Sequence, residues 1–299
     1  MHSDHDHHVS DAAGRALGIG IALNLAFVII EAVAGVLGHS MALLADAAHN
    51  LGDVLGLLLA WGANRLTRRL ASSQFSYGLG SSTLLAALIN GVTLALVSLW
   101  ILWEAGMRLA DPPAVHGLLV IGVALAGVVV NTATAWLLLS GQKHDLNLRG
   151  AFLHMAADAA VSVAVAISGL IVLLTGFALI DPLLSILVSL VILVPAVGLV
   201  RRSLQLVLHG VPEEVDLAAV ERHLAALPGV TDHHHLHVWA LSTRETALSV
   251  HLVMPEPPDD SDTFLHELQA ELWQRFGIRH ATVQIERGSC PCPIDALEG

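Results

Sequence analysis

Charged residues are scarce in this chain of 299 residues, where Asp, Glu, Lys and Arg together make up 13%, against about a quarter in a typical soluble domain. Hydrophobic residues make up 55% of the chain, and the mean hydropathy is +0.68. This composition excludes an ordinary soluble protein and predicts an integral membrane protein. Basic residues are rarer than acidic ones, and the formal charge of -12 gives no support to nucleic-acid binding, which needs a basic patch.

Cysteine is almost absent. The chain has two, Cys290 and Cys292, too few for a disulfide framework, so this Cys-x-Cys pair is interpreted either as soft metal ligands or as exposed thiols. The N-terminal segment from His2 to His8 is polar and lacks the basic region of a cleavable signal peptide. We therefore expect the first apolar segment to direct membrane insertion itself.

Long apolar runs are what the chain has in abundance. A membrane-spanning helix needs roughly 20 apolar residues, and six segments fit: 16–37, 41–64, 81–105, 115–140, 149–175 and 181–200. When six spans are threaded, all but one of the basic residues near their ends fall on one side, which marks that side as cytoplasmic. Both termini are therefore predicted to be cytoplasmic. The exception is Arg108, and the agreeing residues are Arg15, Arg65, Arg68, Arg69, Lys143, Arg149, Arg201 and Arg202.

The character of the chain changes after the sixth segment. From Leu204 onward there are 15 acidic and 5 basic residues, which indicates an acidic, soluble domain. Its pattern predicts helices on one side of a three-stranded sheet, in the order αββαβ, at 215–227, 230–241, 245–254, 261–276 and 279–286. The predicted parts are a histidine-rich tail (1–15), a six-helix transmembrane domain (16–203), this domain (204–288) and a cysteine-containing tail (289–299).

Two His-x-x-x-Asp pairs stand inside apolar segments, His49 with Asp53 and His154 with Asp158. A spacing of four puts both side chains of a pair on one face of a helix. Ionisable groups at membrane depth are costly, and they persist where they face a partner or an aqueous pathway. Two facing pairs supply two imidazole nitrogens and two carboxylates, a set of four ligands suited to zinc, cadmium or cobalt. The alternative is that these groups only hold the helices together by hydrogen bonds.

A metal site inside a helical bundle indicates transport. Imidazole must be deprotonated to bind metal, so loading the site expels protons. We therefore predict a secondary active transporter that exports cytoplasmic Zn2+ in exchange for protons, and not an enzyme. A membrane metalloenzyme and a membrane-embedded metal sensor are the alternative classes; the enzyme would need an open metal position, which four protein ligands do not leave.

Asp46 and Glu31 are further acids in the first two apolar segments. Asp46 precedes His49 by three residues, nearly on the same face. It is interpreted as a fifth ligand, as a carboxylate behind the ligands or at the entrance to the pathway, or as a helix-end residue. Glu31 is interpreted as an interhelical hydrogen-bonding group, with a proton relay as the lesser alternative.

The chain resembles the cation diffusion facilitator family, the zinc-type metal/proton antiporters, at Ser40–Asp53 (SMALLADAAHNLGD), His154–Asp158 (HMAAD), His234–Trp239 (HHLHVW) and His280–Glu286 (HATVQIE). The resemblance covers nearly the whole chain in order. It implies six helices in a lipid bilayer, a ferredoxin-like cytoplasmic domain, a homodimer and export of cytoplasmic metal. We expect the protein in a bacterial inner (plasma) membrane.

The resemblance also implies a regulatory metal site in the soluble domain. The alternative is that several of its histidines are solvated surface residues. The N-terminal histidines His2, His5, His7 and His8 are interpreted either as scavengers of zinc or as part of a polar tail. The ligands implied for the soluble domain are His234, His251, His280 and Glu286, joined by His266 and by the tail cysteines Cys290 and Cys292.

Overall fold

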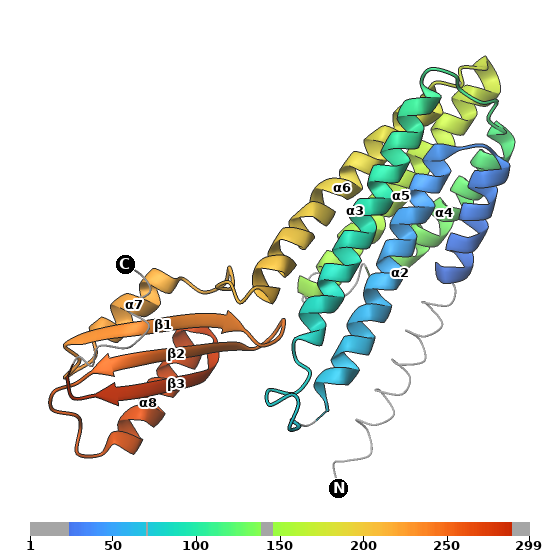
Figure 1. Cartoon of the computed structure of the whole chain (residues 1–299). Coiled ribbons are helices and arrows are strands. Elements are labelled where there is room, and N and C mark those ends of the chain that lie inside the picture. The colour runs from blue at the N-terminus through green and yellow to red at the C-terminus, as the bar shows by residue number, and fades with distance from the viewer. Residues whose placement is uncertain (1–23, 70, 139–145, 289–299) are drawn as a thin grey trace, which may run out of the picture. The chain divides into compact units, whose positions relative to one another are not determined.

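The computed structural model describes residues 24–69, 71–138 and 146–288. These residues form two compact units, one containing most of the helical residues and the other containing the sheet. Among these residues, six helices precede α7 (Leu217–Ala225) and the sheet (Figure 1). The first is described from Asn24 to Leu37. The others are α2 (Met41–Thr67), α3 (Ser82–Arg108), α4 (Gly117–Leu138), α5 (Leu146–Thr175) and α6 (Ile180–Val207).

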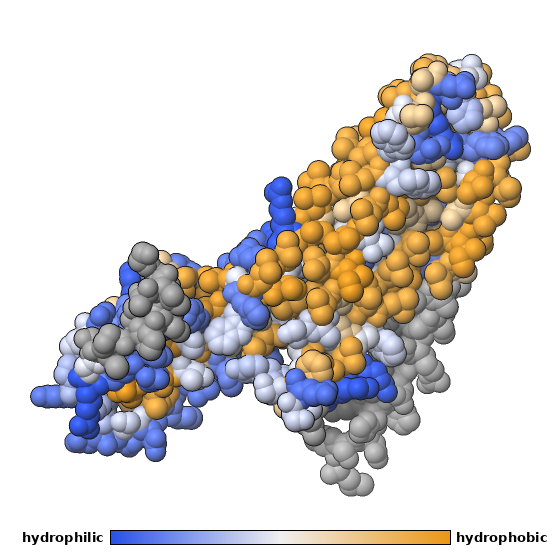
Figure 2. All heavy atoms as spheres, viewed as in Figure 1, coloured by the Kyte–Doolittle hydropathy of each residue, from blue (hydrophilic) through white to orange (hydrophobic). Residues whose placement is uncertain are grey.

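Among the described residues, the five helices α2 to α6 are each long and apolar enough to cross a membrane. Their positions match the predicted segments, except that α6 continues from the predicted end at 200 to Val207. The first predicted span, 16–37, lies partly outside the described residues. The helices carry a broad apolar surface (Figure 2), on which Trp103, Trp136 and Val194 are 71%, 76% and 71% exposed. An apolar surface of this extent indicates contact with lipid, so the chain is an integral membrane protein.

A carboxylate from α6 holds the N-terminus of α2. Ser40 precedes α2, and its hydroxyl accepts a hydrogen bond from the backbone N–H of Leu43 at 3.1 Å, as an N-cap does. Asp181, which is 1% exposed, accepts hydrogen bonds from the hydroxyl of Ser40 and from the N–H of Met41. Unpaired N–H groups make a helix N-terminus a favourable place for a carboxylate. This contact ties α2, which carries His49 and Asp53, to α6.

Glycines allow α4 and α5 to approach closely. A Cβ added at Gly117 of α4 would lie 2.7 Å from the carbonyl oxygen of Gly169 of α5. Farther along, a Cβ at Gly127 would lie 2.9 Å from the hydroxyl of Ser162. Small residues at both contacts let the backbones pack against each other, and this packing positions α5 with its His154 and Asp158.

The C-terminal domain has the predicted order of elements. They are α7 (Leu217–Ala225), β1 (Asp232–Ala240), β2 (Thr246–Val253), α8 (Ser261–Phe276) and β3 (Ile278–Glu286). The central strand β2 pairs antiparallel with β1 and parallel with β3. Both helices contribute to one apolar core with Leu248, Val250 and Leu252 of β2. These three residues share one face of the strand, so the prediction of helices on one side of the sheet is confirmed.

Helix α8 occupies the predicted range 261–276, and the residue before it caps its N-terminus. The N-cap is Asp260, whose carboxylate accepts hydrogen bonds from the N–H of Thr263 at 3.0 Å and from its hydroxyl at 2.7 Å. A carboxylate can accept from both donors at once, which a hydroxyl in its place does less well. These bonds hold the pKa of Asp260 below its ordinary value. The helix ends at Gly277, whose φ of 72° is left-handed and suits glycine.

Candidate metal centres

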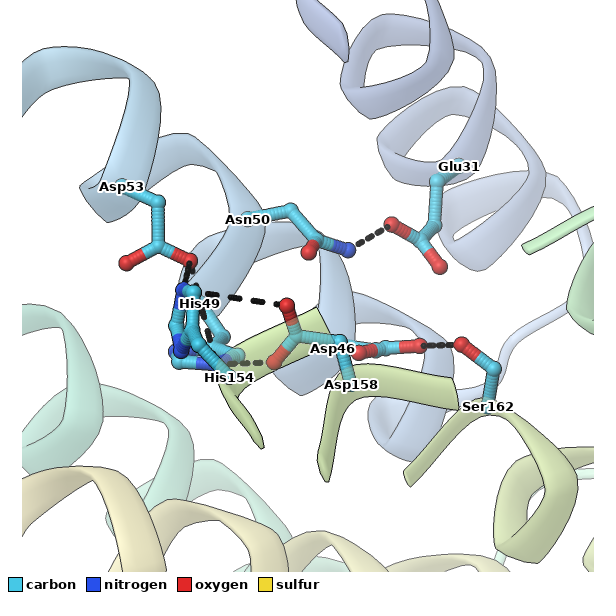
Figure 3. A network of polar contacts seen from close by, with 8 residues as sticks. All are labelled: Glu31, Asp46, His49, Asn50, Asp53, His154, Asp158 and Ser162. Atoms are coloured by element: carbon cyan, nitrogen blue, oxygen red, sulfur yellow. Dashed lines mark hydrogen bonds and ion pairs between the residues drawn. The ribbon is translucent and has the colours of Figure 1, made fainter. Parts of the chain in front are cut away.

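Helices α2 and α5 bring the two His–Asp pairs together (Figure 3). The Nε2 atom of His49 lies 3.1 Å from Oδ1 of Asp158, and Nε2 of His154 lies 3.2 Å from Oδ2 of Asp53. Each imidazole therefore contacts the carboxylate of the other helix. The contacts within each helix are longer, 3.8 Å for His49 with Asp53 and 3.7 Å for His154 with Asp158.

These distances fit a single metal ion. One ligand atom from each of the four residues lies within 4.8 Å of the other three. A tetrahedral zinc ion holds nitrogen and oxygen ligands at about 2.0–2.2 Å, which places the ligands roughly 3.3–3.6 Å from one another. The observed contacts of 3.1 to 3.8 Å bracket that range. An ion can therefore be accommodated with shifts of a few tenths of an ångström.

The exposure of the four side chains falls steadily across the cluster. The side chains of His154 and Asp53 are 43% and 34% exposed, that of His49 is 21% exposed, and that of Asp158 is 2% exposed. Along the helices, Asp53 lies on the side of the C-terminus of α2 and His154 on the side of the N-terminus of α5. The cluster is thus open on that side and buried on the opposite side.

Beyond the buried side of the cluster lies a second polar network (Figure 3). Asp46 and Glu31 are both 0% exposed. Oδ2 of Asp46 accepts a hydrogen bond from the hydroxyl of Ser162 at 3.1 Å, and Oε2 of Glu31 accepts one from the amide of Asn50 at 3.0 Å. The prediction that Glu31 forms an interhelical hydrogen bond is confirmed. Asp46 does not belong to the four-residue cluster.

Sequence reasoning missed Asn50 and Ser162, although a signal was present. Asn50 follows Asp46 by four residues, and Ser162 follows Asp158 by four. Residues at this spacing lie on one face of a helix, so Asn50 shares a face with Asp46, and Ser162 shares a face with Asp158.

A second cluster lies on the C-terminal domain. It consists of His234 on β1, His251 on β2 and Glu286 on β3, with one ligand atom from each within 4.8 Å of the others. Nδ1 of His251 lies 2.8 Å from Oε1 of Glu286, and Nε2 of His234 lies 3.5 Å from Oε2 of Glu286. His234 and His251 are direct partners across the antiparallel pair. The cluster occupies the sheet face opposite the helices, because His251 alternates with the core residues Val250 and Leu252.

Two other predicted ligands do not join this cluster. His280 and Glu286 share a face of β3, but six residues separate them along the strand, which is about 20 Å. His266 is exposed on α8, and α8 covers the opposite face of the sheet. Within one chain, neither residue can reach an ion held by His251 and Glu286. Cys290, Cys292 and the N-terminal histidines lie outside the described residues.

The structure adds His235 to the neighbourhood of this cluster. The register of β1 shifts between His234 and His237, and His235 has a φ of 50°. Such a bulge places two consecutive residues opposite one partner residue, and the ring centroid of His235 lies 5.1 Å from that of His234 and 5.2 Å from that of His251. Regular strand alternation would have put His235 on the other face, so the pattern of the sequence could not identify it.

The apolar helical unit, with a His–Asp cluster between two of its helices, defines an integral membrane protein with a candidate intramembrane metal site. The family described as cation efflux transmembrane domain matches residues 17–208, and the family described as cation efflux protein, cytoplasmic domain, matches residues 212–288. The chain belongs to the cation diffusion facilitator family. That family consists of transporters rather than enzymes.

Several relatives match nearly the full length of the chain. It is 37% identical to the metal cation efflux system protein CzcD of Cupriavidus metallidurans, over 97% of this chain and 92% of that one. It is 36% identical to the zinc transporter ZitB of Escherichia coli, over 98% and 94%. It is 34% identical to a cadmium, cobalt and zinc/H(+)-K(+) antiporter of Bacillus subtilis, over 93% and 91%. A solved structure of the metal-bound C-terminal domain of the CzcD transporter from Cupriavidus metallidurans is 42% identical, covers 24% of this chain and 99% of that chain, and has a TM-score of 0.23.

Proposed function

We propose that the protein exports Zn2+, and also Cd2+ or Co2+, from the cytoplasm in exchange for protons. The ion would bind between α2 and α5, held by His49, Asp53, His154 and Asp158. One observation carries this proposal: four donor atoms from two helices lie within 4.8 Å of one another in a membrane-spanning bundle. The names of the relatives, a zinc transporter and a cadmium, cobalt and zinc antiporter, support the class of ion.

The contacts of the cluster suggest how protons and metal exclude each other. Without metal, each imidazole contacts the carboxylate across the helix interface, at 3.1 and 3.2 Å. A protonated imidazole can donate to that carboxylate, which offsets its charge in the membrane. A divalent ion needs the same nitrogens deprotonated and the same oxygens as ligands. The site therefore holds either protons or a metal ion. If it held neither, the two adjacent carboxylates would repel each other.

The open side of the cluster gives the direction of loading. Asp53 and His154, the more exposed pair, lie toward the C-terminus of α2 and the N-terminus of α5. The excess of basic residues near the helix ends supports a cytoplasmic location for that side. We propose that the described conformation faces inward, with both termini in the cytoplasm of a bacterial cell and the protein in its inner membrane, and that six helices span the bilayer.

We further propose that the C-terminal domain is ferredoxin-like, that it binds zinc through His234, His251 and Glu286, and that it contributes to a homodimer. Two imidazoles and a carboxylate leave one position of a tetrahedral ion unfilled. The ring of His235 lies close enough to this cluster to supply the fourth ligand after a rotation of its side chain. Binding here would regulate transport and is separate from the transport site.

The test is zinc flux into proteoliposomes under an imposed pH gradient. Vesicles with an acidic lumen should take up zinc through molecules whose C-terminal domain faces outward, and the uptake should vanish in Asp158→Ala. Asp111→Ala is the matched control, because Asp111 is an exposed aspartate outside the helices. Gradient-dependent uptake that survives in Asp158→Ala would move the pathway away from this cluster. No uptake by folded wild-type protein would contradict transport and favour a metal sensor.

A further inference from the structure

A pair of buried acids lies beside the proposed transport site without belonging to it. Glu31 on the first helix and Asp46 on α2 are each 0% exposed. Figure 3 shows both on the side of the site away from Asp53. Oε1 of Glu31 and Oδ1 of Asp46 are buried and have no hydrogen-bond donor, although a buried carboxylate oxygen normally has one.

No arginine or lysine side chain of the described residues forms an ion pair with either acid. The ion pairs of arginine side chains involve Glu104, Glu213 and Asp216 instead. The first helix has no other titratable residue from Asn24 to Leu37, and α4 has none from Gly117 to Leu138. The titratable groups that face this region come from α2 and α5. They are Asp46, His49 and Asp53 on α2, and His154 and Asp158 on α5.

Two neighbouring carboxyl groups in a buried, apolar place cannot both carry a charge without a large cost. The contacts indicate which group holds a proton. Asp46 accepts a hydrogen bond from the hydroxyl of Ser162 and lies about one helical turn before His49, so this hydroxyl and a protonated His49 imidazole both favour its charged form. Glu31 has one neutral donor, Asn50, on Oε2, so its Oε1 is the oxygen that can carry hydrogen. Glu31 contacts none of the four proposed metal ligands in any hydrogen bond or ion pair of the described residues.

The pair is connected to the transport site through the same two helices that hold the metal ligands. Asp46 precedes His49 by three residues, about 4.5 Å along the axis of α2. Ser162, which donates to Asp46, follows Asp158 by one turn of α5. A change of charge at the metal site therefore acts on the two acids at short range, through an interior of low dielectric.

We propose that Glu31 is the proton-carrying group of the exchange. This inference rests on the proposed antiport function and adds a group to it. An O–H bond forms at Oε1 when a proton arrives from water as zinc leaves, and it breaks when zinc loads, with the proton returning to water. No other reactant is needed. The positive charge of the ion favours the carboxylate form of Glu31, and the protonated form favours release of the ion, as thermodynamic linkage requires.

The position of Glu31 suits a proton that enters from outside. The residue lies six positions before Leu37, the end of the first helix, which is about 9 Å along the axis. Asp46 lies five positions after Met41, the start of α2. The two acids therefore lie at similar distances from the turn that connects the first helix to α2. In the proposed orientation, that turn faces the outside, and Glu31 is reached before the metal ligands.

The experiment uses the full-length protein in proteoliposomes and compares Glu31→Gln with wild type. Gln preserves the shape and can still accept from Asn50, but it cannot exchange a proton. The matched control is Glu104→Gln, since Glu104 pairs with Arg108 at the end of α3 and does not contact the site. Two readouts are needed: zinc uptake with and without a pH gradient, and protons released per zinc bound, from calorimetry in two buffers of different ionisation enthalpy.

In Glu31→Gln we expect zinc to bind and to move down its own gradient, while the stimulation by a pH gradient falls about tenfold, a typical size for the coupling of two sites. Proton release per zinc should fall by about one, and Glu31→Asp should restore part of both effects. Wild-type coupling and proton release in Glu31→Gln would overturn the proposal. Loss of zinc binding in both Glu31→Gln and Glu31→Asp would also overturn it, because Glu31 would then be a structural residue. If wild type itself shows no flux driven by the pH gradient, the antiport function fails before Glu31 is tested.

Discussion

The unequal burial of the two aspartates in the proposed transport cluster predicts unequal effects of their neutralisation. The side chain of Asp158 is 2% exposed, and that of Asp53 is 34% exposed. A pair of unit charges 4 Å apart interacts by about 4 kcal/mol at an effective dielectric of 20 and by about 1 kcal/mol in water. Asp158→Asn should therefore cost at least about 4 kcal/mol of zinc binding free energy, roughly a thousandfold in Kd.

Asp53→Asn should cost less, because solvent screens its charge. We expect roughly ten- to a hundredfold in Kd, between the two limits. The assay is competition between the purified protein and a zinc-chelating dye, in a Glu286→Gln background that removes a proposed ligand of the C-terminal cluster. Asp111→Asn in the same background is the control. Equal losses for Asp158→Asn and Asp53→Asn, or a larger loss for Asp53→Asn, would refute the reasoning from burial.

Three further outcomes are expected. Glu286→Gln should lower the zinc bound per chain by one equivalent in calorimetry and leave binding at the transmembrane cluster intact, since the two clusters share no residue. Gly117→Val should lower the stability in detergent by about 1–3 kcal/mol, because its side chain meets the carbonyl of Gly169; Gly122→Val, which meets nothing within 4 Å, should not. Asp260→Ala should destabilise the C-terminal domain near neutral pH. That effect should fade as the pH falls through the lowered pKa of Asp260, below which the carboxylate is protonated in wild type too. Tryptophan fluorescence during urea unfolding at several pH values measures it.

Hydrophobic runs and their spacing predicted most of the architecture. The apolar segments located α2 to α6 because a helix in lipid must satisfy all its backbone hydrogen bonds within itself, which makes length and hydropathy strong signals. The alternation of the sequence in β2 agrees with its buried face, which places Leu248, Val250 and Leu252 in the core. These periodicities depend only on the geometry of each helix or strand, so they can be recognised in a single sequence.

Features that depend on contacts between elements were harder to predict. His–Asp spacing put His49 and Asp53 on one face of a helix, but it could not show that each imidazole contacts the carboxylate of the other helix. The bulge in β1 brings His235 toward His251, and the sequence pattern did not predict this bulge. The cap of α8 is Asp260, whose two carboxylate oxygens each accept a hydrogen bond from one donor of Thr263.

The position of zinc in the full-length protein tests the central claim most directly. Anomalous diffraction at the zinc absorption edge, from crystals grown with zinc, locates the bound ions without reference to function. We expect one peak between α2 and α5, within about 2.0–2.2 Å of a nitrogen or oxygen atom of His49, Asp53, His154 and Asp158, and no such peak in Asp158→Asn. Zinc found on the C-terminal domain alone, in crystals of wild-type protein at saturating zinc, would contradict the intramembrane site.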